Sequence, residues 1–183
     1  MKQLILASAS PRRREILDRL GIAYTVCPAE SEAEPDLSLA AEEAILQVAR
    51  SKAEEVASRF PNEYVLGADT AVVIDGAILG KPQDEEEAKA MLRRLSGRTH
   101  HVITAVWVCG NGFDRGFADV AEVMFYPMTE KDIEEYVATK EPMDKAGSYG
   151  VQGYGARYIR GINGDFYTVM GLPAGRLYRF LGE

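Results

Sequence analysis

The chain has 183 residues, of which 46% are hydrophobic and 27% are charged, a composition typical of a globular protein with one sizeable core. Its formal net charge of −7 argues against binding a nucleic acid polymer, because such binding rests on many lysine and arginine contacts to phosphate. A small phosphorylated ligand needs only a local cluster of cations and is not excluded. We therefore expect a single domain over residues 1–183.

The sequence carries no sign of export or of a membrane span. Its two cysteines, Cys27 and Cys109, do not have metal-ligand spacing, and the N-terminal segment lacks the long apolar stretch of a signal peptide. Uninterrupted apolar runs are much shorter than the roughly 20 residues that cross a bilayer. We expect a cytoplasmic protein with no membrane partner and with both cysteines as free thiols.

A strand followed by a helix opens the chain. Residues 3–7 are typical of a short buried strand, and Ser10 and Pro11 are typical of the cap and the first turn of a helix. That helix should end near Leu20, before Gly21.

The later elements are predicted from apolar spacing, capping patterns and turn residues. In the first half we expect a strand over residues 23–27, a loop over 30–36, a helix over 39–58, and a strand over 64–74 ending in a turn at Asp75 and Gly76. In the second half we expect a helix that begins at a capping box of Asp84 and Glu87 and ends at 95, followed by strands over 101–108 and 117–125 that pair across a turn at 110–112. A helix over 129–139, capped by Thr129 and Asp132, should come next. An ordered loop over 146–155 and a helix over 172–181 complete the prediction. Strands mixed with helices in this order favour an α/β fold with a mixed sheet.

The segment SASPRRR at residues 8–14 could bind an anion. Serine hydroxyls and the N–H groups at the start of a helix lie there beside three arginines, whose charge opposes the helix dipole unless an anion offsets it. The alternative is an ordinary helix start with solvated arginines.

Asp69 and Thr70 stand inside the apolar strand pattern, and burying an unpaired carboxylate is costly. Asp69 is therefore either a structural residue paired with a neighbour or a catalytic base or metal ligand. Lys52 and Lys81 are candidate phosphate partners, although a lone lysine is usually a solvated surface residue.

The glycine-rich segment DKAGSYGVQG at residues 144–153 could bring backbone close to a ligand, and Gln152 could read a base through its paired donor and acceptor. A tight structural loop is the alternative. His100 and His101 are adjacent on a predicted strand, so they point to opposite faces and cannot share one metal. The sequence has no HExxH, Walker or GxSxG motif, which argues against zinc hydrolase, P-loop and serine hydrolase mechanisms.

Six segments in order, SASPRRREIL, GADTAVV, LGKPQD, LRRLSGRTHHVITAV, EPMDKAGSYGVQG and VMGLP, resemble the Maf family of nucleotide pyrophosphatases from end to end. The resemblance implies a mixed, twisted α/β sheet with flanking helices, and two lobes around a nucleotide cleft, as in Maf and ITPase proteins. It also implies a nucleoside triphosphate substrate, cleaved between the α and β phosphates, and a divalent cation. It leaves open whether the chain forms a homodimer.

The resemblance also implies roles for single residues. Asp69 matches the family's proton acceptor, and five residues match positions around the phosphates: Ser8, Ser10, Arg13, Lys52 and Lys81. Arg12, Thr70 and Gln152 match the branch that acts on dTTP and UTP, whereas the branch acting on 7-methyl-GTP carries Trp, Gln and Glu there.

The metal ligands are less clear in the acidic loop. Where the family often has two consecutive glutamates, Glu32 matches the first and Ala33 replaces the second, with Glu34 as a substitute if the loop shifts. We expect Glu32 and Asp69 to bind the cation, with Mg²⁺ favoured and Mn²⁺ as the alternative. The rival function is a nucleotide-binding regulator of cell division and septum formation without turnover, which has no reason to place Asp69 beside a phosphate.

Overall fold

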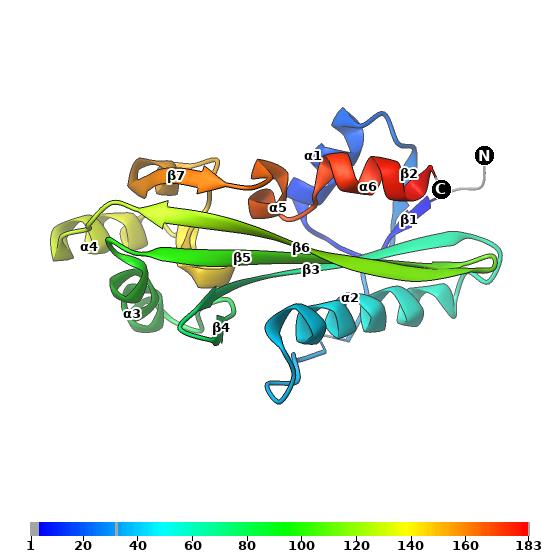
Figure 1. Cartoon of the computed structure of the whole chain (residues 1–183), viewed down its shortest axis with the longest axis horizontal. Helices are drawn as coiled ribbons and strands as arrows, with labels where there is room; N and C mark the ends of the chain where they lie inside the picture. The colour runs from blue at the N-terminus through cyan, green and yellow to red at the C-terminus, as the bar shows by residue number, and fades with distance from the viewer. Residues whose placement is uncertain (1–3, 32, 183) are drawn as a thin grey trace. The chain divides into compact units, whose positions relative to one another are not determined.

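The computed structural model describes residues 4–31 and 33–182. Helices and strands alternate along most of the chain (Figure 1). In order they are β1 (Leu4–Leu6), α1 (Pro11–Arg19), β2 (Tyr24–Val26), α2 (Ala41–Ala57), β3 (Tyr64–Ile74), β4 (Ala77–Leu79), α3 (Glu85–Leu95), β5 (Thr99–Gly110), β6 (Phe113–Phe125), α4 (Glu130–Ala138), β7 (Ile159–Asn163), α5 (Phe166–Met170) and α6 (Ala174–Leu181). Three 3-10 helices, η1 (Glu141–Asp144), η2 (Ala146–Ser148) and η3 (Tyr154–Tyr158), separate α4 from β7.

The strands form one seven-stranded sheet in the order β2-β1-β3-β5-β6-β7, with β4 paired to β3. β1 runs parallel to both β2 and β3, whereas β4 is antiparallel to β3 and β7 is antiparallel to β6. The predicted α/β fold with a mixed sheet and flanking helices is therefore confirmed.

The chain divides into two compact units, which we call unit 1 and unit 2. Unit 1 takes its described residues from Met1–Thr70, Thr104–Asp119 and Gly171–Glu183, and unit 2 takes them from Ala71–Ile103 and Val120–Met170. The long strands β3, β5 and β6 each contribute residues to both units. The prediction of a single domain stays a prediction.

In unit 1, helices cover both faces of the sheet, with α2 on one face and α1 and α6 on the other (Figure 1). α2 lies very close to β3: a Cβ atom on Gly67 would be 2.2 Å from the carbonyl oxygen of Ala49. Only glycine fits there, because no side chain can occupy that distance. On the other face, the ring of Phe180 makes edge contacts with Phe113 and Phe117 of β6.

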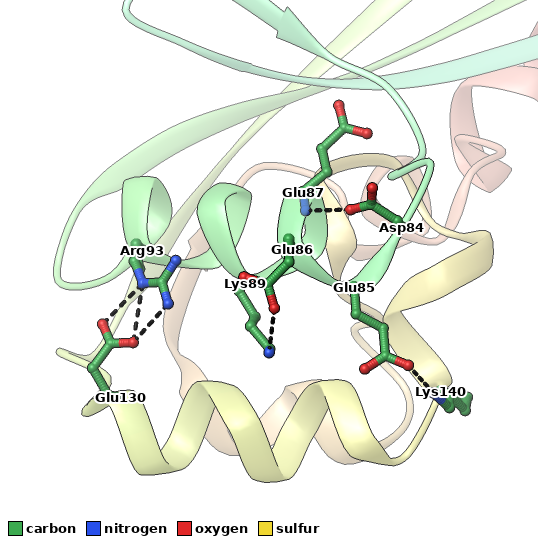
Figure 2. A network of polar contacts seen from close by, with 8 residues as sticks. All are labelled: Asp84, Glu85, Glu86, Glu87, Lys89, Arg93, Glu130 and Lys140. Carbon is green, nitrogen blue, oxygen red and sulfur yellow. Dashed lines mark hydrogen bonds and ion pairs between the residues drawn. The ribbon is translucent and has the colours of Figure 1, made fainter.

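In unit 2, charged side chains join α3 to the start of α4 and to Lys140, which follows α4 (Figure 2). Arg93 makes a bidentate contact to Glu130 over 2.8 to 3.0 Å, and Lys140 pairs with Glu85. All four side chains are largely exposed, so solvent screening leaves each pair a minor part in the stability of the unit. The hydrophobic core of this unit includes Leu92, Leu95, Ile133, Tyr136 and Tyr149.

Several local predictions are confirmed. The Thr129 and Asp132 capping box is present at the start of α4, and β3 is one continuous strand through Asp69 and Thr70. His100 is 1% exposed whereas His101 is exposed, as adjacent residues on a strand should be. Cys27 and Cys109 are free thiols.

Other local predictions are wrong in detail. Ser10 stands at the N-cap of α1, but its side chain makes no capping hydrogen bond. At α3 Asp84 accepts from the Glu87 amide, but the Glu87 carboxylate accepts from Gln83 N–H instead of completing the box. The segment 146–155, expected to lack regular structure, includes η2 and the start of η3.

The sequence also failed to indicate β7 and α5. β7 is a half-exposed edge strand with a central glycine, and it is held by pairing with β6, so no local pattern marks it. α5 has only five residues, too few for a periodic signal. None of the helices formed by residues 4–31 and 33–182 is long and apolar enough to cross a membrane.

Candidate functional site

Arg13 is the centre of a buried hydrogen-bond cluster in unit 1. It lies in the first turn of α1, because Pro11 starts the helix, and it is 9% exposed. Its Nε donates to the Gly171 carbonyl at 2.9 Å, Nη1 to Ser8 Oγ at 2.9 Å, and Nη2 to Thr70 Oγ1 at 3.2 Å. Desolvation lowers the pKa of Arg13, although nearby Asp69 opposes that shift. An arginine retains its charge even so, because the guanidinium group is too basic to lose its proton in a protein.

The second contact of the site joins Lys52 of α2 to Asp69 of β3. Lys52 Nζ donates to Asp69 Oδ1 at 2.6 Å, and the two side chains are 17% and 22% exposed. A partly buried carboxylate is thus stabilised by a cation, which is what both the structural and the catalytic interpretations of Asp69 require. The sequence named both residues but not their pairing.

Thr70, the residue after Asp69, connects the arginine cluster to the neighbouring strand β5. Its Oγ1 accepts from Arg13 and shares a hydrogen bond with Thr104 Oγ1 at 2.9 Å. Thr104 is fully buried, and the sequence analysis did not single it out. Its signal was available: it is a polar residue in the middle of the apolar run of β5.

The start of α1 is rich in donors. Ser8 is buried, and its Oγ accepts from the Ser10 amide at 3.3 Å as well as from Arg13. No acidic side chain lies in the first turn. Arg12 is half-buried, whereas Arg14 is exposed and donates to the Ala9 carbonyl at 3.2 Å. This is the cationic helix start that the sequence analysis proposed as an anion site.

Two predicted residues lie in unit 2. Lys81 is exposed on the loop after β4, next to Gly80, whose carbonyl accepts from the Gly147 amide at 3.0 Å. Gln152 is exposed on the loop between η2 and η3. Glu32, the predicted first metal ligand of the acidic loop, lies outside the described residues.

The structure therefore brings the predicted residues of unit 1 into two direct groups. Ser8, Arg13 and Thr70 share one hydrogen-bond cluster, and Lys52 and Asp69 form one ion pair. Because Asp69 and Thr70 are consecutive on β3, the two groups are neighbours along the strand but lie on opposite faces of the sheet.

The donor set suits a hard cation carried by a phosphorylated ligand. Within the described part of the chain, no three His, Cys, Asp or Glu side chains are grouped closely enough to hold a metal ion. Asp69 offers a carboxylate, and Mg²⁺ commonly binds through one or two carboxylates together with phosphate oxygens and waters. These residues fit a cation that phosphates help to hold.

Comparison with known proteins gives full-length matches. The sequence model described as "Maf-like protein" matches residues 3–183. A dTTP/UTP pyrophosphatase from Bacillus velezensis is 50% identical over 182 residues, covering 100% of this chain and 96% of that protein. A dTTP/UTP pyrophosphatase from Halalkalibacterium halodurans is 44% identical over 181 residues, covering 99% and 95%. A crystal structure of a nucleoside-triphosphatase / dITP/XTP pyrophosphatase from Mycobacterium abscessus is similar with 14% identity, a TM-score of 0.49, and coverage of 98% and 97%.

Proposed function

Because this chain belongs to the Maf family, we propose that it is a nucleoside triphosphate pyrophosphatase that hydrolyses dTTP and UTP to the monophosphate and pyrophosphate. One structural observation carries the proposal: consecutive residues of β3, Asp69 and Thr70, contact Lys52 and Arg13 respectively. A carboxylate that can accept a proton therefore stands beside the cation Lys52, and the same carboxylate acts electrostatically on Arg13.

In the proposed reaction, the oxygen of a water molecule bonds to the α-phosphorus. The anhydride bond between the α and β phosphates breaks, and pyrophosphate leaves. Asp69 accepts the proton that the water loses. Lys52 holds the Asp69 carboxylate in place at 2.6 Å and can shift a donor toward phosphate oxygens, since an ammonium has three. Positioning and charge neutralisation supply most of the rate, as is general in phosphoryl transfer.

Arg13 acts in this proposal mainly through position. Three of its five N–H groups already donate to protein oxygens, so its guanidinium is held rigidly beside Thr70. Ser8 and Ser10 at the start of α1, and Lys81 of unit 2, are proposed as further phosphate partners. The amides at the start of α1 add to the same attraction for an anion.

We propose Mg²⁺ as the divalent cation, with Mn²⁺ as the alternative, and Asp69 as one of its ligands, together with Glu32. When bound, the cation neutralises charge on the phosphate oxygens. For specificity, we propose Arg12, Thr70 and Gln152, because a planar guanidinium and an amide match the carbonyl and N–H edge of thymine or uracil.

The test is a nucleotide panel with purified protein and Mg²⁺. Pyrophosphate should be the first product, and dTTP and UTP should give the highest kcat/KM. Adding EDTA should abolish turnover, and excess Mg²⁺ should restore it. Orthophosphate as the first product would reject the proposed reaction. Tight nucleotide binding without any product would instead support the rival regulator.

A further inference from the structure

The carboxylate of Glu141 lies at the centre of the loop that carries Gln152 and binds its backbone. Glu141 opens η1 in unit 2. Its Oε2 accepts from the Tyr154 amide at 2.7 Å, and its Oε1 accepts from the Gly155 amide at 3.0 Å. One side chain thus satisfies two successive backbone donors at the far end of the loop.

A second anchor holds the near end of the same loop. The hydroxyl of Tyr136 on α4 donates to Glu141 Oε1 at 2.8 Å, and the Gly150 amide donates to that hydroxyl oxygen at 3.0 Å. Tyr136 is 2% exposed and part of the unit's core. Residues 150 and 154–155 are therefore tied to one tyrosine–glutamate pair, and Gln152 lies exposed between the tied positions.

The loop follows the carboxylate so closely that only glycine fits at two positions. A Cβ atom on Gly153 would be 2.1 Å from Glu141 Oε2, and a Cβ atom on Gly155 would be 2.5 Å from the Tyr136 hydroxyl oxygen. The backbone that follows Gln152 is shaped around these two side chains.

Glu141 is ionised in this setting. Desolvation raises the pKa of its carboxyl group, but hydrogen bonds from the Gly155 and Tyr154 amides and from Tyr136 outweigh that effect and lower it. Lys145, which donates to the Glu141 carbonyl at 2.8 Å, contributes in the same direction. Charge-assisted hydrogen bonds of this kind are stronger than neutral ones, so the anchor resists local opening.

We infer that Glu141 is a positioning residue for base discrimination, which holds the loop in the one conformation that presents Gln152 to the base. The inference rests on the proposed function, since Gln152 discriminates bases only if a nucleotide is the substrate. Glu141 itself acts through Gln152 and not on the reacting atoms. If the loop sampled several conformations, the Gln152 amide would not keep the paired hydrogen bonds on which base discrimination depends.

Glu141→Gln tests this with little change in shape. The variant keeps one acceptor oxygen, but it replaces the other with an NH₂ group that opposes a backbone donor. Glu135→Gln on the exposed face of α4 is the matched control, because the Glu135 carboxylate forms only a 3.7 Å ion pair with Lys131 among the described residues. Hydrogen exchange should accelerate at the amides of Gly150, Tyr154 and Gly155 in Glu141→Gln and stay unchanged in the control.

The kinetic measurement compares dTTP with dCTP, whose base differs at the edge that an amide reads. The ratio of their kcat/KM values should fall at least about fivefold in Glu141→Gln, mainly through a higher KM for dTTP, and should not change in Glu135→Gln. Gln152→Ala should lower the ratio similarly. Adding Glu141→Gln to Gln152→Ala should change the ratio by less than about twofold, because both changes remove the same contact.

Each outcome separates the inference from the function on which it rests. Wild-type protein that releases no pyrophosphate from any nucleotide rejects the proposed function. If wild-type protein is active and the dTTP to dCTP ratio of kcat/KM is unchanged in Glu141→Gln, the inference alone is rejected. The inference is also rejected if Glu141→Gln lowers that ratio as much in the Gln152→Ala background as it does in wild type. If Glu141→Gln does not fold, Tyr136→Phe replaces it: this variant removes the hydroxyl that anchors Gly150, and a dTTP to dCTP ratio unchanged from wild type then overturns the inference.

Discussion

Lys52 Nζ and Asp69 Oδ1 lie 2.6 Å apart and join α2 to β3 at the centre of the candidate site. The pair is partly buried, so neither charge is fully solvated and each depends on the other. For catalysis this contact holds the carboxylate at one place on the strand. For stability it means that removing either partner leaves a charge without its counter-charge.

Asp69→Asn separates these two roles. The amide keeps the size of the side chain but cannot accept a proton from water, so kcat should fall on the order of 100-fold or more. The protein should remain folded, with a loss of about 1 to 3 kcal/mol in the free energy of unfolding, because Lys52 loses its counter-charge. Steady-state kinetics and urea unfolding measure the two effects.

Asp119→Asn is the control for that variant. Its side chain is 21% exposed, close to the 22% of Asp69, and it also forms an ion pair, with Arg176 at 2.9 Å. We expect an unchanged kcat and a smaller loss of stability, because the partner Arg176 is 51% exposed whereas Lys52 is 17% exposed. Equal activity in Asp69→Asn and Asp119→Asn would assign Asp69 to structure alone.

Arg13→Lys should destabilise the protein although it keeps the charge. Lysine lacks the planar fork that reaches Gly171, Ser8 and Thr70, so at least one buried oxygen would lose its donor. The free energy of unfolding should drop by about 2 to 3 kcal/mol. Arg14→Lys, one residue along the same helix turn but exposed, should change it by less than about 0.5 kcal/mol. Equal effects in the two variants would contradict the buried cluster.

The Arg13 cluster and the Lys52–Asp69 ion pair show what the sequence could and could not predict. The resemblance to the Maf family singled out Arg13, Lys52, Asp69 and Thr70, whereas the residue pattern alone left structural alternatives open for the helix start, for Lys52 and for Asp69. Neither predicted that Arg13 bonds to the Gly171 carbonyl, 158 residues away in the chain. Contacts at that separation are set by the packing of whole elements, which no local pattern encodes.

The same division holds for the fold. The capping box of Thr129 and Asp132 and the continuous β3 were predictable, because hydrogen bonds and apolar spacing within a few residues determine them. β7 was not, since its residues pair only with β6 and its own pattern is weak. The loop at residues 146–155 was recognised as ordered, but its anchor on Glu141 comes from outside the loop.

Acid should destabilise the protein through His100. Its ring is buried between Phe125 and Tyr149, Nε2 lies 2.8 Å from the Tyr149 hydroxyl, and desolvation, with a smaller effect of His101, lowers the pKa of His100 from 6.5 to about 4. The unfolded chain therefore binds a proton between pH 6.5 and about pH 4 that the folded chain does not. Stability should fall as pH drops through this window, by up to about 3 kcal/mol.

His100→Phe checks the assignment, because it keeps a ring of similar shape and removes the titrating group. The free energy of unfolding, measured by urea at about pH 7 and about pH 4.5, should depend less on pH in this variant than in wild type. His101→Gln is the control, since His101 is exposed and should leave the pH dependence unchanged. An identical pH dependence in wild type and His100→Phe would assign the acid sensitivity to other groups.

Arg12, Thr70 and Gln152 should determine which base is accepted, and the structure shows that these three positions are not equivalent. Thr70 Oγ1 accepts from Arg13 and contacts Thr104, so Thr70→Gln should also disturb the buried cluster and lower kcat/KM for every nucleotide. Arg12 is half-buried and Gln152 is exposed, so they can be exchanged at less structural cost.

We therefore expect Arg12→Trp with Gln152→Glu to lower kcat/KM for dTTP and UTP at least roughly tenfold and to raise the relative use of 7-methyl-GTP, because a tryptophan ring favours a methylated purine cation. Measuring kcat/KM for the three nucleotides on the wild type, this double variant and the triple variant with Thr70→Gln separates base reading from general damage. An unaltered ranking in a folded double variant would mean that Arg12 and Gln152 do not read the base.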